Sequence, residues 1–254
     1  MPQKYVIGVD GGGSKTAAVV LDAAGQVHGR ATTGSVNHHN VGLEQAEANL
    51  TQVMELALAD AGLAPADLAA AAWALAGVDR PSERQLFEAL ANRLWPAIPI
   101  RVENDALAAL VAGVGLTPGV TLIAGTGMIA YGRAADGRRA RAGGWGYLFD
   151  VGSGYYLVRS ALRRLSQAFD QGNMSSSTLL PALLQATQTA AVPELLAWMY
   201  GRERPIADIA ALAPLVLTAA EETDLFALAT VNEGAGALAR AVRDVAQQLG
   251  FHEP

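Results

Sequence analysis

The chain has 254 residues, of which 51% are hydrophobic and 17% charged, so it is long enough for one large domain or two modest ones. A formal net charge of −6 argues against a basic surface for nucleic acid or anionic lipid. The absence of cysteine excludes disulfides, thiolate nucleophiles and Cys-ligated metal centres. The sequence offers neither a secretory signal nor an apolar run of about 18 residues for a membrane span. We therefore expect a soluble cytoplasmic protein.

Strands and helices alternate through the first half of the chain. Apolar periodicity predicts strands at 5–9, 17–21, 26–32, 70–75 and 98–102, and helices at 43–61, 82–95 and 106–112. The helix at 43–61 ends at Gly62, a residue common after helix C-termini. This alternation predicts an α/β fold.

The second half repeats a glycine-linked strand pair and then becomes helical. Strands are predicted at 120–124 and 129–133, and helices at 155–169, 179–187, 192–200, 206–217 and 224–249. The repetition suggests two related halves, which we place at residues 1–117 and 118–254. The apolar helical block is compatible with self-association into a homodimer.

A glycine-rich stretch near the N-terminus, G-V-D-G-G-G-S-K-T at residues 8–16, predicts a phosphate-binding turn. A P-loop needs G-x-x-x-x-G-K-[ST], but Ser14 precedes Lys15 here. Both a P-loop and a dinucleotide-binding loop open a helix, whereas residues 17–21 read as a strand. The stretch therefore predicts a β-hairpin instead.

Such a hairpin has the donors and the acid that the phosphates of ATP need. Glycines let backbone N–H groups approach phosphate closely, hydroxyl groups add donors, and an aspartate can hold Mg²⁺ directly or through water. The candidates are Asp10, Gly11, Gly12, Gly13, Ser14, Lys15 and Thr16. A plain glycine turn is the alternative, but a second glycine turn at Gly125, Thr126 and Gly127 favours phosphate binding from both halves.

Five motifs in order carry a resemblance over nearly the whole chain: G-V-D-G-G-G-S-K-T, G-S-V-N-H-H-N-V-G, V-E-N-D-A, I-A-G-T-G-M-I-A-Y-G and G-G-W-G-Y-L-F-D-V-G-S-G. Together they resemble the BadF/BadG/BcrA/BcrD ATPase family and, within it, the N-acetylglucosamine kinases. The resemblance implies a two-lobed actin-like ATPase fold, whose ribonuclease-H-like lobes close over nucleotide and substrate. It also implies ATP and Mg²⁺ as cofactors and phosphorylation of the 6-hydroxyl of N-acetylglucosamine or a related amino sugar.

Asp105 is the predicted general base, since it follows a strand and opens a helix, where its carboxylate can reach a sugar hydroxyl. The resemblance implies that it takes the proton of the 6-hydroxyl as that oxygen attacks the γ-phosphate, and it places Asn104 among the substrate-binding residues. In the alternative reading, Asp105 or Asn104 only caps the helix.

Asn37 matches the sugar-contacting asparagine of the family, and its amide can donate to and accept from hydroxyls. A turn residue in a loop is the alternative. His38 and His39 follow it, but the sequence shows no third ligand, so we expect loop or cleft-wall residues and no metal site.

The resemblance implies that a later segment lines the sugar: Gly143, Gly144, Trp145 and Asp150. Asp150 would accept from hydroxyls, whereas Trp145 fits packing and sugar stacking equally well. Ser14 and Thr126 match phosphate-contacting positions, and Lys15 either approaches phosphate or points into solvent.

The chain departs from the family pattern at three positions and at its end. Met128, Phe149 and Val151 replace residues of other types, which leaves the identity of the sugar open. The family's adenosine-binding Gly-Gly loop would follow the helix at 224–249, where this chain ends at residue 254. We therefore expect weakened ATP binding and keep a catalytically impaired sugar-binding or regulatory protein as the alternative. The family's other class, an ATP-driven electron-transferring activator, is disfavoured because such activators hold their iron–sulfur cluster with cysteines and this chain has none.

Overall fold

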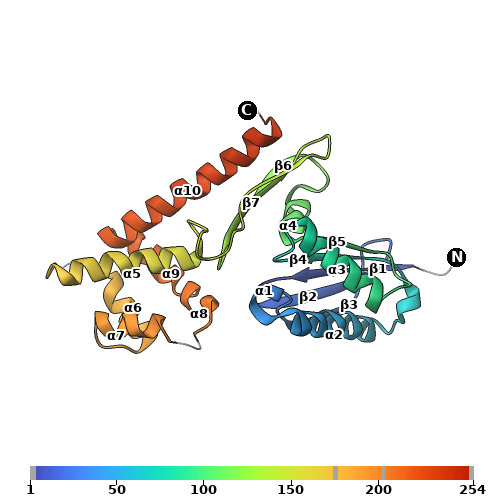
Figure 1. The fold of residues 1–254 in the computed structure, drawn as a ribbon, viewed down its shortest axis with the longest axis horizontal. Coiled ribbons are helices and arrows are strands. Elements are labelled where there is room, and N and C mark those ends of the chain that lie inside the picture. The colour runs from blue at the N-terminus through green and yellow to red at the C-terminus, as the bar shows by residue number, and fades with distance from the viewer. Residues whose placement is uncertain (1–3, 174–176, 202–203, 252–254) are drawn as a thin grey trace. The chain divides into compact units, whose positions relative to one another are not determined.

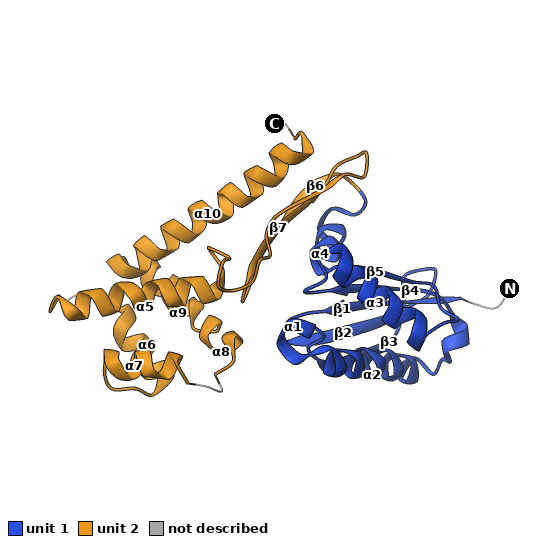
Figure 2. Cartoon of the chain, viewed as in Figure 1, with its two compact units in different colours: residues 1–116 blue, residues 117–254 orange. Residues whose placement is uncertain are grey.

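The computed structural model describes residues 4–173, 177–201 and 204–251. The chain divides into two compact units, residues 1–116 and residues 117–254 (Figure 2). Each unit has its own sheet and its own core, and each is described by itself below.

Unit 1 contains a five-stranded sheet in the order β3-β2-β1-β4-β5 (Figure 1). Its strands are β1 (Tyr5–Gly11), β2 (Lys15–Leu21), β3 (Val27–Gly34), β4 (Leu68–Leu75) and β5 (Ile100–Asn104). The first three strands run antiparallel, while β4 and β5 run parallel to β1. Asp10 pairs with Ala74, which in turn pairs with Glu103, so β1, β4 and β5 end at the same edge of the sheet.

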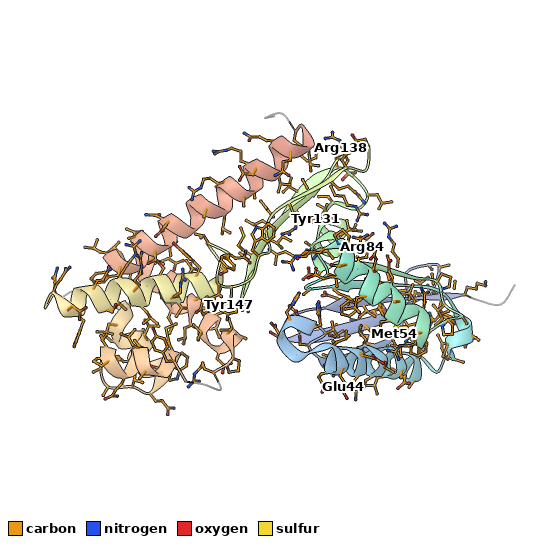
Figure 3. All side chains as sticks on the ribbon, viewed as in Figure 1. Glu44, Met54, Arg84, Tyr131, Arg138 and Tyr147 are labelled. Atoms are coloured by element: carbon orange, nitrogen blue, oxygen red, sulfur yellow. The ribbon has the colours of Figure 1, made fainter. Side chains whose placement is uncertain are left out.

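The helices of unit 1 are α1 (His38–Val41), α2 (Leu43–Ala61), the short 3₁₀ helix η1 (Pro65–Asp67), α3 (Pro81–Leu94) and α4 (Asp105–Val114). Alternate residues of β1, such as Ile7 and Val9, share one apolar core with Phe87 of α3 and with Met54 of α2, which is labelled in Figure 3. Helix α4 packs against β1, β4 and β5. The apolar core and helix α4 thus fix the position of the sheet edge at which β1 and β5 end.

Unit 2 begins with an antiparallel sheet of β6 (Gly119–Ala124), β7 (Met128–Arg133) and β8 (Arg139–Gly143). The long helix α10 (Leu225–Leu249) packs along it, and the two share a small core that includes Ala130 and Val245. The remaining helices form a second apolar cluster together with the first turns of α10: α5 (Gly154–Asp170), α6 (Leu179–Thr187), α7 (Val192–Met199), α8 (Ile206–Ala210) and α9 (Ala213–Glu221). None of the described helices is long and apolar enough to cross a membrane.

Most predicted elements are confirmed within two residues at each end, but the single helix predicted at 206–217 was wrong. Residues 206–217 form two helices because Pro214, in the first turn of α9, lacks the N–H that would continue a helix. The fifth strand lies two residues later than predicted, at Ile100–Asn104. Strand β8 and the short helix α1 were not predicted.

Asp224 organises the helical part of unit 2. Its Oδ1 accepts from the backbone N–H groups of Phe226 and Ala227 at 2.9 and 3.0 Å, which caps α10. Its Oδ2 accepts from the Ser177 hydroxyl at 2.8 Å and the Leu179 N–H at 3.1 Å, at the start of α6. One buried carboxylate therefore joins the N-termini of two helices.

Asp224→Ala is expected to lower the free energy of unfolding by about 2–4 kcal/mol, because it removes two caps and leaves buried donors unpaired. Burial raises the pKa of Asp224, but the four hydrogen bonds outweigh it and hold that pKa below its usual value. The stabilisation is therefore present near neutral pH and is lost as the pH falls through the lowered pKa. Urea denaturation at pH 7 measures the effect. Asp136→Ala, in an exposed turn, is the control and should cost far less.

Candidate active site

Acidic residues from three places in the sequence converge at the edge of unit 1 where the parallel strands end. Asp10 is the penultimate residue of β1, Asp79 lies in the loop after β4, and Asp105 follows β5 directly. The charges of Asp79 and Asp10 both act on the carboxylate of Asp105. The sheet thus places a cluster of negative charge beside the glycine hairpin between β1 and β2.

Asn104, not Asp105, caps helix α4. The Asn104 side-chain oxygen accepts from the Ala106 N–H at 2.8 Å, and its amide donates to Asp79 Oδ1 at 2.6 Å. Asp105 is the first helical residue and is half-buried. The cap is therefore supplied without Asp105, while both ends of the Asn104 amide are used inside the protein, which weighs against the predicted contact of Asn104 with substrate.

The environment of Asp105 favours its protonated form. Burial, the main cause, and the charges of Asp79 and Asp10 together raise the pKa of Asp105 from 3.8 to about 6. Hydrogen bonds from the backbone of Ala106 and of Asp105 itself partly offset these effects. A carboxylate with a pKa near 6 is a far stronger base than an ordinary aspartate and is still ionised at pH 7.

The glycine stretch forms the predicted hairpin. Gly12 N–H donates to the Lys15 carbonyl at 2.9 Å, and Gly13, Ser14 and Lys15 are exposed at its tip. A Cβ on Gly11 would overlap the side chains of Val36 and Leu75, both buried in the core, so this position needs glycine for close packing.

Thr16 does not lie with these exposed residues. Its side chain is fully buried, and its hydroxyl donates to the Gly34 carbonyl at 2.7 Å. Side chains alternate between the two faces of a strand, and Thr16 of β2 lies on the inner face. The burial and this hydrogen bond weigh against the predicted contact of the Thr16 hydroxyl with phosphate and favour a role in the packing of the sheet.

The hairpin is joined to the loop that carries Asn37. The Ser35 hydroxyl donates to the Gly12 carbonyl at 3.1 Å and accepts from the Asn37 N–H at 3.1 Å. The Asn40 amide donates to the Gly13 carbonyl at 3.3 Å. Asn37 itself caps α1, since its side-chain oxygen accepts from the His39 N–H at 3.1 Å. Its amide nitrogen is not part of that cap.

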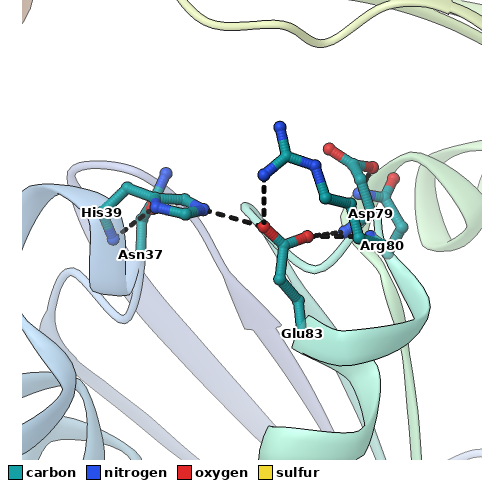
Figure 4. A network of polar contacts seen from close by, with 6 residues as sticks. Asn37, His39, Asp79, Arg80 and Glu83 are labelled. Atoms are coloured by element: carbon teal, nitrogen blue, oxygen red, sulfur yellow. Dashed lines mark hydrogen bonds and ion pairs between the residues drawn. The ribbon is translucent and has the colours of Figure 1, made fainter.

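His39 has a partner that sequence reasoning missed. Its Nε2 lies 3.1 Å from Glu83 Oε1 of α3 (Figure 4), and a nitrogen of His38 completes a group whose ligand atoms all lie within 4.8 Å of one another. The premise that the histidines lack a third candidate ligand is therefore wrong. Burial, followed by the charge of His39, lowers the pKa of His38. Glu83 already accepts hydrogen bonds from three groups, so these contacts favour a structural role for the three residues over a metal site.

The second glycine turn joins β6 to β7 in unit 2, and a later segment encloses it. Gly125 N–H donates to the Gly127 carbonyl at 2.9 Å, while the Gly125 carbonyl accepts from the Gly154 N–H at 2.7 Å. Gly144 N–H donates to the Met128 carbonyl at 2.7 Å. Thr126 is exposed at the tip of the turn. The predicted phosphate turn and the predicted sugar-lining segment are thus one hydrogen-bonded assembly.

Asp150 is the centre of that assembly. Its Oδ1 accepts from the Trp145 N–H at 2.9 Å, and its Oδ2 accepts from the N–H groups of Gly146 and Met128 at 3.1 and 3.3 Å. The residue is buried. Both carboxylate oxygens therefore bind the backbone of the protein itself, which favours a role in shaping the segment over the predicted contact with sugar hydroxyls.

The side chains around Asp150 divide between core and surface. Met128 is buried in the core shared with α10, and its sulfur lies where a Cβ on Gly143 would be, so this departure from the family pattern serves packing. Trp145 is 60% exposed, with the Arg141 guanidinium 4.3 Å from its ring centroid, and Phe149 is 72% exposed. Tyr147, labelled in Figure 3, packs edge-on against Tyr155 at 4.9 Å. The exposed aromatic rings remain available to a ligand.

The proteins that match nearly the whole chain include two curated relatives and a solved structure at 30% identity or more. N-acetyl-D-glucosamine kinase from Dictyostelium discoideum is 31% identical over 99% of this chain and 82% of its own length. N-acetylmuramic acid/N-acetylglucosamine kinase from Clostridium acetobutylicum is 31% identical over 98% of this chain and 81% of its own. The crystal structure of a Chromobacterium violaceum protein, assigned as an N-acetylglucosamine kinase, is 30% identical with a TM-score of 0.81 and covers 98% of this chain and 85% of that one.

These likenesses confirm the predicted α/β fold of the actin-like ATPases. The family model matches residues 7–254, a range that includes the glycine hairpin, the Asn37 loop, Asp105 and the Asp150 segment. The chain belongs to the BadF/BadG/BcrA/BcrD ATPase family.

Proposed function

We propose that this protein is an ATP-dependent kinase that phosphorylates the 6-hydroxyl of N-acetylglucosamine or a related amino sugar. The observation that carries the proposal is Asp105: a carboxylate with a pKa raised to about 6, at the edge of the sheet beside an exposed glycine hairpin. Two relatives that cover nearly the whole chain bear the names of kinases for such sugars, which supports the substrate class.

In the proposed reaction the sugar's 6-oxygen attacks the γ-phosphorus of ATP, and the bond between that phosphorus and the ADP oxygen breaks. Asp105 accepts the proton of the 6-hydroxyl, so that the attacking oxygen does not become positively charged. Phosphoryl transfer needs little covalent help from a protein, so orientation and charge neutralisation supply most of the catalysis. Asn37 is the proposed sugar contact in unit 1.

Phosphate contacts are proposed for both glycine turns. Gly13, Ser14 and Lys15 expose backbone or side-chain donors in unit 1, while the Gly12 N–H closes the turn on the Lys15 carbonyl. The exposed hydroxyl of Thr126 is the corresponding donor in unit 2. The exposed Trp145 is the proposed apolar wall for the sugar, and Asp150 is proposed to hold that wall in place.

The residues present fit a hard divalent cation such as Mg²⁺. Asp10 is an exposed carboxylate beside the phosphate hairpin, with further negative charge from Asp79 and Asp105, and oxygen donors of this kind suit Mg²⁺. Asp10 would hold the ion, directly or through water. When bound, the ion would neutralise charge on the phosphates.

A coupled assay that follows ADP release tests the function. The protein is incubated with Mg-ATP and a panel containing N-acetylglucosamine, glucosamine, N-acetylmannosamine, N-acetylmuramic acid and glucose. We expect sugar-dependent ADP release that is fastest with an N-acetylated hexosamine and is lost in Asp105→Ala. Sugar binding without turnover would instead support a non-catalytic sugar-binding protein.

The pH dependence of kcat/KM is expected to follow the raised pKa of Asp105. Because the base must be ionised, kcat/KM should fall about tenfold per pH unit below roughly pH 6. An ordinary aspartate with a pKa of 3.8 would give a flat profile down to about pH 4.5. Circular dichroism at each pH separates titration from unfolding, and a profile that stays flat to pH 4.5 in the folded protein would contradict the assignment.

A further inference from the structure

The loop between β4 and α3, residues 76–80, touches the two parts of unit 1 that the proposed function needs. Ala76 N–H donates to the Gly11 carbonyl at 2.7 Å, which ties the loop to the phosphate hairpin. Gly77 has a φ of +81°, and a Cβ there would lie 2.8 Å from Asn37 Oδ1. The backbone of this loop thus presses against the Asn37 side chain and needs glycine to do so.

Glu83 fixes the backbone of this loop through hydrogen bonds. It occupies the third position of α3, where its Oε2 accepts from the N–H groups of Asp79 and Arg80 at 3.0 and 2.8 Å. Its Oε1 pairs with His39 Nε2 at 3.1 Å, and Arg80 Nη1 lies 3.6 Å away (Figure 4). One carboxylate therefore caps α3 and reaches across to α1.

From Glu83, one chain of hydrogen bonds leads to Asn37 and another leads to Asn104, next to Asp105; together they form one connection. Toward the sugar loop, the His39 N–H donates to Asn37 Oδ1 at 3.1 Å. Toward the base, Asp79 Oδ1 accepts from the Asn104 amide at 2.6 Å, and Asn104 caps the helix that starts with Asp105. Glu83 contacts both halves of this connection, through His39 and through the backbone of Asp79.

The charge of Glu83 suits it to this place. Burial raises the pKa of Glu83, but the backbone N–H groups of Arg80 and Asp79, the His39 hydrogen bond and the Arg80 charge outweigh it, so the pKa lies below its usual value. The carboxylate is thus ionised at neutral pH, and hydrogen bonds to an ionised acceptor are shorter and stronger than neutral ones. The Glu83 side chain is only 11% exposed, so its backbone hydrogen bonds lie in the protein interior, whereas its partner His39 is 53% exposed.

We propose that Glu83 is a positioning residue that sets the separation between Asn37 and Asp105, so that a bound amino sugar presents its 6-hydroxyl to the base. The inference rests on the proposed function, and Glu83 acts through its neighbours without touching the substrate. A displacement of about 1 Å in such a site can cost two orders of magnitude in rate.

The test uses Glu83→Gln, His39→Ala and the double variant, with kcat and the sugar KM measured separately from the melting temperature. Each single change is expected to raise the sugar KM and lower kcat, by about tenfold in kcat/KM. The double variant should be no worse than the more damaging single change, because both changes break the same connection. The KM for ATP should change less than that for the sugar.

Asp67→Asn is the matched control for Glu83→Gln. Asp67 is also the third residue of its helix and accepts from the Ala64 N–H at 2.8 Å, but it has no link to the Asn37 loop. It should lower the melting temperature without changing the sugar KM.

Gly77→Ala tests the same connection from the other side. Its Cβ would displace Asn37, so we expect a raised sugar KM. Gly62→Ala has a similar backbone strain, with a φ of +66°, but no atom lies within 4 Å of the added Cβ. It should therefore destabilise the protein and leave the sugar KM unchanged.

Two outcomes overturn the inference. In the first, Glu83→Gln and His39→Ala have kcat/KM values for the sugar within twofold of that of Asp67→Asn. In the second, the loss of kcat/KM in the double variant equals the product of the losses in the two single variants. Failure of the proposed function is a separate result, because it shows as a wild-type protein that phosphorylates none of the sugars. In that case calorimetric N-acetylglucosamine affinity of the same variants decides the inference. A wild-type protein that does not bind the sugar overturns both.

Discussion

Replacing Asp105 with asparagine is expected to lower kcat by about 10²- to 10⁴-fold, because the amide cannot accept the proton of the 6-hydroxyl. The change is nearly isosteric, and Asn104 still caps α4, so the helix and the sugar site should remain in place. The KM for the sugar should therefore change little. The coupled assay with N-acetylglucosamine and Mg-ATP measures both constants.

The same substitution is expected to stabilise the protein at neutral pH. In the folded state the pKa of Asp105 is raised to about 6, whereas in the unfolded chain it returns to about 3.8, so stability falls as the pH rises through this window. Above it, keeping the ionised carboxylate in place costs on the order of 2 kcal/mol, allowing for partial exposure to water. Asp105→Asn removes that cost.

Thermal unfolding at pH 7.5 and pH 3.5 measures the change in stability. Asp105→Asn should melt higher than wild type at pH 7.5 and nearly equal to it at pH 3.5, where the native aspartate is already protonated. Glu88→Gln, which removes an exposed charge from α3, is the control and should melt like wild type at both pH values.

The kinetic result has its own contrary outcome. An Asp105→Asn variant that keeps a third or more of the wild-type kcat would show that another residue is the general base.

Asp150→Asn is expected to lower the free energy of unfolding by about 1–3 kcal/mol and to raise the sugar KM. An asparagine has one acceptor oxygen, so at least one of the three backbone N–H groups now bound to the carboxylate would lose its partner. Because Met128 and Trp145 are among those donors, the glycine turn and the exposed aromatic wall would both be loosened. Urea denaturation and the coupled assay measure the two effects.

The two roles considered for Asp150 predict different results. A carboxylate that only contacts sugar would leave the stability of the ligand-free protein unchanged when it is replaced, while one that shapes the segment would not. Asp136→Asn is the matched control in unit 2, since Asp136 also accepts a backbone N–H, from Arg138 at 2.9 Å, but in an exposed turn. An unchanged melting temperature of Asp150→Asn together with a raised sugar KM would instead show that Asp150 contacts the sugar.

Local patterns predicted the elements that bury one regular face. The helix predicted at 43–61 matches α2 (Leu43–Ala61), and the helix predicted at 179–187 matches α6 (Leu179–Thr187), because both have an apolar stripe and clear ends. The burial of Thr16 was also within reach, since alternation along β2 puts it on the side of Ala18 and Val20. Strand β8 was missed although Arg139–Gly143 alternates charged and small residues, because its small residues gave little apolar signal.

The connections within the site could not be predicted in the same way. Glu83 stands three residues after Arg80 with Pro81 between them, a spacing that indicates a helix start and nothing more. Its contact with His39 exists only because α1 and α3 pack in the same unit. Likewise, no local pattern decides which of Asn104 and Asp105 caps α4, since both residue types cap helices well.

The parallel order of β1, β4 and β5 has a consequence for how the site forms during folding. Asp10, Asp79 and Asp105 meet only after two crossover connections, through α2 and through α3, have been completed. The glycine hairpin, in contrast, is local and can form early. Bringing the acids together adds charge repulsion when these parallel strands pair, so the proposed sugar binding would report complete folding of this unit, whereas formation of the hairpin alone would not.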